Sequence, residues 1–341
     1  MIRRLLAYAW LLARLVLPLA APAAAAPATA PLNVAAVDAI GFTVGDLERS
    51  VAFYSRVLSF TRQSEIEVDG SDYEQLEGVP GSRMQVVRMA LGTESIELTR
   101  YLVPQGRALP EDSRSNDLWF QHIAIVVSDI DRAYQRLRQY NVEPASPEPQ
   151  RLPDWNVAAG GIRAFYFRDP DGHFLELIQF PPGKGDSRWQ RADDRLFLGI
   201  DHTAIVVSDT AASLALYRDR LGLVVAGESE NFGPEQERLN HVAGVHLRIT
   251  GLRAPLGPGI ELLEYLAPRD GRRIELRAND LAHWQTRLII PGLAPAEPAL
   301  RSSPLELVSP RIVSLSGGEL GFRAGVLVRD RDGHALQLTA P

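Results

Sequence analysis

The side chains best suited to chemistry in this sequence are imidazoles and carboxylates that recur at steady intervals. His122 and His202 each stand near the start of a similar apolar run, and Glu176 and Glu261 follow them after comparable distances. Glu97 lies at the same place in an earlier segment. Imidazole and carboxylate groups suit a divalent Fe, Mn, Zn, Ni or Co ion. The pattern therefore predicts a divalent metal site, with the identity of the ion left open.

An internal repeat carries these residues. The segment 121–129 recurs as 201–209, and six consecutive residues are identical, beginning two after each His. A second duplication relates 168–177 to 329–338, each containing an Asp-x-Asp-Gly-His run. A repeat at fixed spacing indicates an architecture built from copies of one unit.

Two further copies follow from this alignment. The segment 37–46 matches the first motif, with Ala39 at the place of the His, and residues 279–281 match 116–118. The second match aligns Gln285 with His122, and His283 is the rival if that alignment slips by two positions. The sequence thus contains four modules.

Each module has the pattern of a strand, a helix and three more strands. An alternating apolar run predicts the first strand, and an Asp seven positions after the His place can cap the next helix, which is predicted at 47–58 in the first module. The last strand carries the Glu, flanked by apolar residues. Three prolines interrupt the helix pattern of the fourth module. We expect an α+β fold of four β-α-β-β-β modules paired into two cupped mixed sheets.

The linkers predict how the modules pair. The segment after the first module resembles the segment after the third, whereas the segment after the second is different and rich in Gly and Pro. This predicts one domain at 36–180, a linker at 181–198 and a second domain at 199–341. The first cup would then hold Ala39, Glu97, His122 and Glu176, and the second cup His202, Glu261, Gln285 and Gln337.

These motifs resemble those of the vicinal oxygen chelate superfamily, which includes glyoxalase I, extradiol dioxygenases, fosfomycin-resistance proteins and methylmalonyl-CoA epimerase. The resemblance covers residues 36–341. It implies a metal ion whose open positions chelate two neighbouring oxygens of a small-molecule substrate. Carried over by position, it implies Glu97, His122 and Glu176 as ligands in one cup. In the other cup it implies His202 and Glu261, with Gln285 as an additional candidate.

Departures from the family pattern bear on the reaction. Ala39 removes a ligand from the first predicted cup, and Gln337 replaces a carboxylate in the second. Extradiol dioxygenases use two His and one Glu in one cup, which neither predicted cup offers, so a glyoxalase-like isomerase or lyase is favoured over a dioxygenase. In such isomerases one Glu acts as general base, which implies catalytic roles for Glu97 and Glu176.

Two tyrosines are candidate substrate contacts. Tyr101 and Tyr265 each lie four residues after a candidate Glu and should share its face of the strand. Plain packing is the competing interpretation for both.

Two other functional interpretations stay open at this point. One is a non-catalytic small-molecule binding protein similar to the bleomycin-resistance members, which Ala39 and Gln337 favour. The other is that one domain is catalytic and its duplicate a degenerate scaffold, with the first domain expected to be active.

Composition narrows the class of protein and its location. The 341 residues include 36 basic and 42 acidic side chains with no block of like charge, which gives no electrostatic footprint for nucleic acid. There is no cysteine, so thiolate metal sites and disulfides are excluded. A basic, apolar and then Ala-rich N-terminus predicts a signal peptide at 1–30 and a periplasmic or secreted protein without stable membrane insertion. Whether the protein forms a homodimer is left open by the sequence.

Overall fold

The structure is a computed structural model that describes residues 31–191, 194–301 and 303–341. The predicted signal peptide at 1–30 lies outside the described residues, so export and its cleavage site stay predictions. Within the described part of the chain, no helix is long and apolar enough to cross a membrane.

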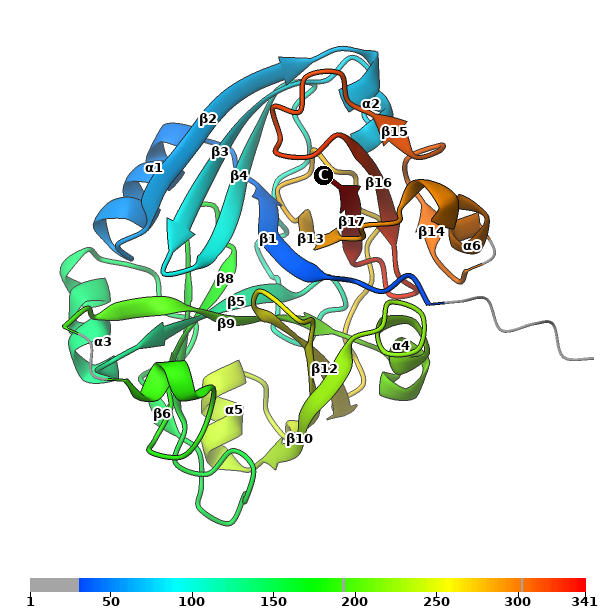
Figure 1. Ribbon diagram of the computed structural model, residues 1–341. Coiled ribbons are helices and arrows are strands. Elements are labelled where there is room, and N and C mark those ends of the chain that lie inside the picture. Colours follow the sequence, from blue (N-terminus) through cyan, green and yellow to red (C-terminus); the bar gives the residue numbers. More distant parts are fainter. Residues whose placement is uncertain (1–30, 192–193, 302) are drawn as a thin grey trace, which may run out of the picture. The chain divides into compact units, whose positions relative to one another are not determined.

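The four modules appear along the chain as expected (Figure 1), but the first and third contain an additional short helix and the fourth an additional short strand. The first contains β1 (Ala36–Thr43), α1 (Leu47–Arg56), β2 (Thr61–Asp69), α2 (Ser71–Glu77), β3 (Arg83–Leu91) and β4 (Glu94–Val103). The second contains β5 (Gln121–Val127), α3 (Ile130–Gln139), β6 (Gln150–Arg151), β7 (Arg163–Arg168) and β8 (Phe174–Gln179), followed by a 3-10 turn at Ser187–Gln190.

The third module contains β9 (Phe197–Val206), α4 (Thr210–Tyr217), β10 (Val224–Phe232), α5 (Pro234–Asn240), β11 (His246–Arg253) and β12 (Gly259–Ala267). The fourth contains β13 (Trp284–Ile289), a 3-10 turn at Ala294–Ala296, α6 (Glu297–Arg301), β14 (Glu306–Leu307), β15 (Val313–Ser314), β16 (Ala324–Arg329) and β17 (Ala335–Ala340). Its prolines leave only the short α6 where the other modules have a longer first helix.

The predicted Asp caps are confirmed. Asp46, Asp129 and Asp209 each accept a hydrogen bond from the backbone N–H three residues later, at the start of α1, α3 and α4. Such a bond satisfies one of the free N–H groups at a helix N-terminus. Each of these helices begins shortly after the first strand of its module ends, so the cap fixes where that strand lies relative to its helix.

Two curved mixed sheets form, which confirms the expected fold class, but the expected pairing of modules is wrong. One sheet has the order β14-β16-β17-β13-β1-β4-β3-β2, with β15 also paired to β16, and joins modules one and four. The other has the order β10-β11-β12-β9-β5-β8-β7-β6 and joins modules two and three. The central contacts are antiparallel, between β1 and β13 and between β5 and β9. Neither sheet therefore corresponds to the predicted domains 36–180 and 199–341.

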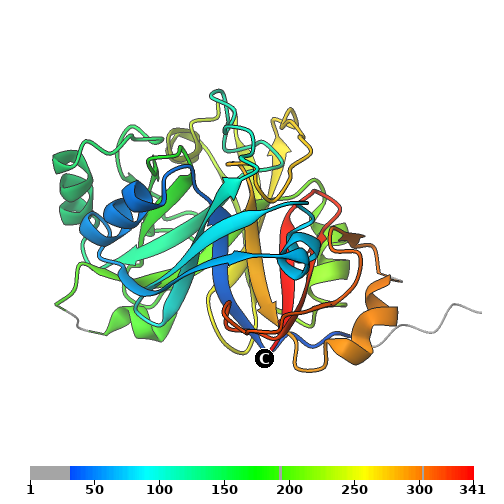
Figure 2. The same ribbon diagram turned by 90° about the horizontal axis from the view of Figure 1, so that it is seen from above.

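The core explains why modules one and two nevertheless lie together. The largest apolar cluster takes side chains from both, among them Ile40 and Phe42 of β1, Ile123 and Ile125 of β5, and residues of α1 and α3. Arg136 of α3 also donates to the backbone oxygen of Arg56 at the end of α1, and Figure 2 shows the two helices side by side. A second cluster joins modules three and four.

Consecutive modules therefore pack through the faces of their sheets that lie opposite the cups. Side chains alternate between the two faces of a strand. His122 faces a cup and Ala124 lies on the same face of the strand, while Ile123 and Ile125 face the shared core. Each module thus shares a sheet with one module and packs through the opposite face of that sheet against a different module.

Candidate metal centre

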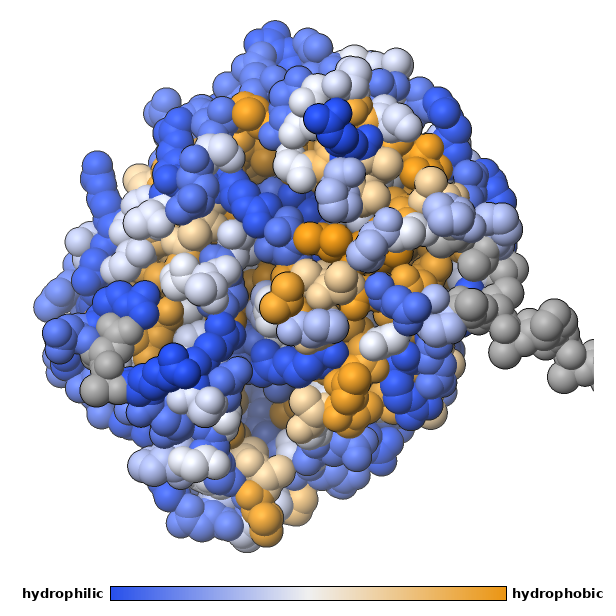
Figure 3. All heavy atoms as spheres, in the orientation of Figure 1, coloured by the Kyte–Doolittle hydropathy of each residue, from blue (hydrophilic) through white to orange (hydrophobic). Residues whose placement is uncertain are grey.

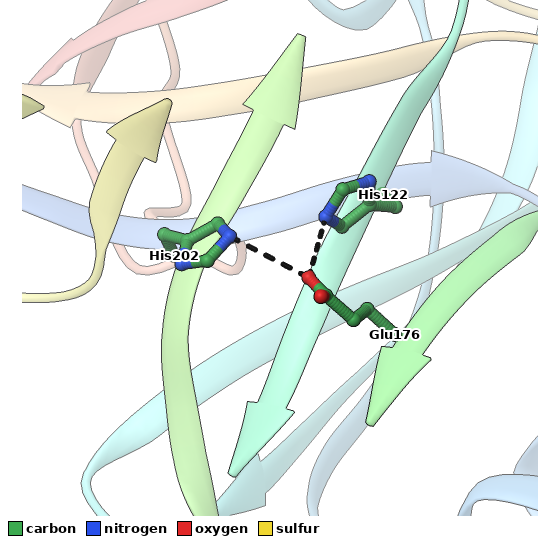
Figure 4. A group of neighbouring side chains, drawn as sticks. All are labelled: His122, Glu176 and His202. Atoms are coloured by element: carbon green, nitrogen blue, oxygen red, sulfur yellow. Dashed lines mark hydrogen bonds and ion pairs between the residues drawn. The ribbon is translucent and has the colours of Figure 1, made fainter. Parts of the chain in front are cut away.

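Four donor side chains meet in the cup formed by modules two and three. His122 comes from β5, Glu176 from β8 and His202 from β9, and donor atoms of these three lie within 4.8 Å of one another (Figure 4). Glu261 of β12 joins them, with its Oε2 3.3 Å from His202 Nε2. The structure therefore brings together four of the five predicted metal ligands.

Strand register produces this convergence. His122 is paired with Phe174 across the parallel strands β5 and β8, and Glu176 lies two residues further on the same face. His202 is paired with Gly259 in the same way, with Glu261 two residues further. Because the antiparallel β5–β9 contact places the two first strands side by side, both pairs point into one cup.

The distances between donors fit a single ion. Glu176 Oε2 lies 3.0 Å from His122 Nε2 and 3.7 Å from His202 Nε2. Ligands that each lie about 2.0–2.2 Å from a common ion are separated from one another by about 3–4 Å. Two imidazoles and two carboxylates are also a donor set typical of first-row divalent metals. The cluster could therefore hold a divalent metal ion.

A further carboxylate, that of Asp201, orients the imidazole of His202. Asp201 Oδ2 lies 3.0 Å from His202 Nδ1, which leaves Nε2 directed into the cup. Arg253 donates to the same carboxylate at 2.8 Å and Trp189 donates to its other oxygen at 2.7 Å. Ligating histidines typically have such a partner on the other ring nitrogen. Sequence reasoning missed Asp201, although it directly precedes His202 within the repeated motif.

Charge within the cup shifts the acidities accordingly. Burial alone would lower the pKa of His202, but the carboxylates of Glu261, Asp201 and Glu176 raise it to about 9. Burial opposes ionisation of Asp201, yet the hydrogen bond from His202 and the charge of Arg253 hold its pKa below the usual range. Desolvation raises the pKa of Glu261. The cup thus concentrates negative charge around the two imidazoles.

Packing, rather than a hydrogen bond to Nδ1, holds the far side of the His122 ring. Its Nδ1 is buried and has no hydrogen-bond partner among the described residues. The ring lies between Phe120 and Tyr166, at centroid distances of 5.4 and 5.0 Å. Tyr166 is also directly opposite Glu176 on the neighbouring strand β7, so its side chain borders the site. Sequence reasoning missed this tyrosine as well.

A cavity of about 460 Å³ opens beside the cluster. His122, Glu176, His202 and Glu261 line it together with Tyr166 and residues of β10 and β11. Figure 3 shows a hollow on this face, over the region where β10, β12 and α5 are labelled in Figure 1. The volume is in the range of small-molecule sites.

The cup of modules one and four has a different interior. Glu97, predicted as a ligand beside His122, instead lies on β4 of the other sheet and forms a bidentate ion pair with Arg287 of β13. Arg88 also contacts Glu97 at 3.2 Å. The prediction that Glu97 converges with His122 and Glu176 is therefore wrong, because module one shares its sheet with module four.

Among the described residues, the remaining predicted positions of this cup form no group of three acids or imidazoles close enough to hold a metal ion. Gln337 accepts from Arg287 Nε at 2.8 Å, and Gln285 lies 3.1 Å from His283. Gln285 is paired with Ala335 as His122 is with Phe174, which confirms the alignment that prefers it over His283. The hollow that remains is about 10 Å³, enough for one water.

The two predicted substrate contacts lie away from the cavity. Tyr101 borders the small hollow of the other cup. Tyr265 is buried beneath α5, where its hydroxyl accepts from Asn240 at 2.8 Å and lies 3.3 Å from Ser115 Oγ. Among the described residues that line the 460 Å³ cavity, the tyrosine is Tyr166. A substrate role for Tyr101 or Tyr265 stays a prediction.

Comparison with known proteins agrees with this architecture. The family model described as Glyoxalase/Bleomycin resistance protein/Dioxygenase superfamily matches residues 36–177 and 199–286. A 2-epi-5-epi-valiolone epimerase from an Actinomyces species is 32% identical over 154 residues, covering 43% of this chain and 81% of that protein. The uncharacterized protein YaeR of Escherichia coli is 31% identical over 149 residues, covering 43% and 98%.

One solved structure extends the likeness to nearly the whole chain. Glyoxalase I from Zea mays superposes with a TM-score of 0.59 at 16% identity, over 90% of this chain and 92% of that one. This likeness shows the fold. With a family match over more than half of its length, the chain belongs to the glyoxalase/bleomycin resistance protein/dioxygenase superfamily.

Proposed function

We propose that this protein is a divalent-metal-dependent enzyme that moves a proton at a carbon adjacent to a carbonyl of a small molecule, as isomerases and epimerases do. The observation that carries the proposal is the convergence of His122, Glu176, His202 and Glu261 beside a cavity. The likeness to an epimerase supports the same reaction class.

The number of donors favours proton transfer over dioxygen chemistry. With Glu261 beside the group of His122, Glu176 and His202, four protein side chains would hold the ion. Oxygenases with non-haem iron typically use two His and one carboxylate, which leaves a further position for dioxygen. His122, His202 and Glu176 supply that set in one cup, contrary to the expectation that neither cup would, so the preference for proton transfer rests on Glu261 as the fourth donor. A divalent ion held there would supply Lewis-acid polarisation of a substrate carbonyl.

Glu261 is the better placed of the two carboxylates to act as general base. Its side chain is 27% exposed, against 8% for Glu176, which lies between both imidazoles. Gly251 lies opposite Glu261 on the next strand and leaves space over its carboxylate, whereas Tyr166 occupies the corresponding place beside Glu176. A general base needs this freedom to reach the substrate proton.

Solvent exchange tests the reaction and the role of Glu261 together. We expect the metal-loaded protein to exchange the hydrogen next to the carbonyl of a 2-hydroxyketone with deuterium, measured by NMR in D₂O. Glu261→Gln should retain most of the metal and lose exchange by at least about 100-fold, the usual scale of general base catalysis. Glu176→Gln is the matched change and should lose metal as well. Exchange that persists in Glu261→Gln would contradict its role.

The non-catalytic interpretation has lost part of its basis. Ala39 and Gln337, which favoured it, both lie in the other cup. It predicts protein without metal after purification from metal-replete medium, and a melting temperature that does not respond to a chelator. A metal bound only by the folded protein raises that temperature instead.

A further inference from the structure

The cavity beside the metal centre is lined by acidic side chains. Its described lining includes one arginine and no lysine, and the acidic residues are Glu176, Glu261, Asp201, Asp186 and Glu228. A divalent cation would balance Glu176 and Glu261, and Arg253 is bound to Asp201. Glu228 then remains at the exposed edge, where Asp186 is paired with Arg188 at 3.6 Å. No described lining residue offers a free positive charge to an anionic substrate.

Basic side chains near the edge are already engaged. Lys184 donates to the backbone oxygens of Val157 and Ala158 at 2.7 and 3.0 Å. Arg151 is paired with Asp154 at 2.6 Å. Both contacts engage the positive groups with the loop of residues 151–158 at the edge of the cavity. A phosphate or carboxylate in the cavity would thus lose water without gaining a counter-charge, which is costly.

In the wall formed by module three, one face of β10 presents uncharged polar groups, while aliphatic side chains of β11 and β12 also line this wall and Glu228 lies at its edge. Gly227, Ser229 and Asn231 alternate along β10 and all line the cavity. Gly227 is paired with Gly251 of β11, and a Cβ added at Gly227 would meet nothing within 4 Å. Paired glycines in a sheet mark a place where another group can approach the backbone closely. This wall therefore has room for a ligand body next to Glu261.

A buried chain of amides supports that wall. Asn156 donates to Asn231 Oδ1 at 2.7 Å, Asn231 donates to Gln236 Oε1 at 3.1 Å, and Gln236 is bonded to Asn240. All four are buried, and Asn231 and Gln236 border the cavity. Side-chain amides fixed in this way donate to and accept from hydroxyl groups without adding charge.

The opposite wall, from module two, is mostly apolar. Ile162, Ala164, Ile178 and Phe180 line it. A ligand held between the two walls would place hydrocarbon against these residues and oxygen atoms toward β10 and α5.

Resting on the proposed proton transfer, we propose that the substrate is an electrically neutral, hydroxylated carbonyl compound of about monosaccharide size. Phosphate esters, coenzyme A thioesters and glutathione conjugates all carry anionic groups that this cavity does not match. Specificity of this kind arises as much from the missing counter-charge as from the favourable contacts.

Binding to the zinc-loaded protein tests the inference. The probes are a polyhydroxylated cyclohexanone, the same compound phosphorylated at the ring carbon farthest from the ketone, and the parent 2-hydroxycyclohexanone. Calorimetry should give the neutral polyhydroxylated ketone the tightest binding, by at least about tenfold over each of the others. Equal or tighter binding of the phosphorylated compound would overturn the inference, and so would equal binding of the parent ketone.

A charge placed in the wall gives the converse test. Ser229→Lys should raise the affinity for the phosphorylated ketone about tenfold or more, while the matched uncharged change Ser229→Gln should leave the preference for the neutral ketone unchanged. An unaltered preference in Ser229→Lys would overturn the inference. Failure of the proposed function is distinguishable, because it would appear as absence of zinc binding or of deuterium exchange with every probe.

Discussion

Ala39 and Arg287 face each other across β1 and β13 in the register in which His202 and Ala124 face each other across β9 and β5. One cup thus has a small residue opposite an imidazole, and the other has a small residue opposite a guanidinium. The guanidinium binds Glu97, the counterpart of Glu261. In the cup of modules one and four, the guanidinium of Arg287 therefore occupies the place that a metal cation would have in the other cup.

This relationship predicts opposite consequences for two similar substitutions. Glu176→Gln should abolish tight metal binding with a modest change in stability. Glu97→Gln should leave metal content unchanged but destabilise the fold by about 3 kcal/mol, because it removes the bidentate partner of the buried Arg287 and leaves the carboxylate of Asp38 at 3.5 Å. Elemental analysis and urea unfolding of both variants measure the two effects. Loss of metal in Glu97→Gln with retained stability would contradict the assignment.

The sequence alone was sufficient to predict the four modules and the positions of the donor residues within them. The repeat placed His122, Glu176, His202 and Glu261 on the correct strands, because alternation and register within a module are local properties. Pairing between modules is decided by contacts between distant strand edges, such as β1 with β13, for which the linkers carried no signal. Arg287 was also unpredictable, since its role depends on Glu97 arriving from another module.

Asp201 should control metal affinity through His202. Its carboxylate bonds His202 Nδ1, and it is itself held by Arg253 and Trp189. Asp201→Asn should weaken metal binding by about 10–100-fold, as is common when a ligand's supporting carboxylate is altered. Competition with a chromogenic chelator measures this. The control is Asp219→Asn, which alters an exposed pair with Arg218 and should leave metal affinity unchanged.

Glu77 should make stability depend on pH. Burial raises the pKa of Glu77 from its ordinary value of 4.5 to about 7, and Gln337 donates to it at 3.0 Å. Between about pH 4.5 and pH 7 the folded protein holds a proton that the unfolded chain has released. The contribution of Glu77 to stability therefore falls as the pH rises through this window, by on the order of 3 kcal/mol.

Urea unfolding at several pH values compares wild type with Glu77→Gln. The variant should lose the decline in unfolding free energy across this window, because it carries no titrating group at this position. Glu67→Gln, on the exposed strand β2, should keep the decline. Unfolding free energies of the wild type and Glu77→Gln that depend on pH in the same way over this window would contradict the role of Glu77.

A substitution at Gly251 can reproduce, in the cup of modules two and three, the arginine–glutamate contact of the other cup. It lies opposite Glu261 as Arg88 lies opposite Glu97. A Cβ at Gly251 would be 3.7 Å from the nearest backbone oxygen and 3.9 Å from Glu261 Oε1, both ordinary contacts, so substitution should not disturb the strand. Gly251→Arg should place a guanidinium beside Glu261.

The expected result is a folded protein with a filled cavity, metal affinity reduced at least about tenfold by repulsion between the guanidinium and the ion, and no deuterium exchange. Gly251→Ala is the control, and it should retain metal because it adds only a methyl group at contact distance. Isothermal titration with zinc and the melting temperature separate lost affinity from lost folding. If Gly251→Arg bound zinc like the wild type, a guanidinium at this position could not account for the difference between the two cups.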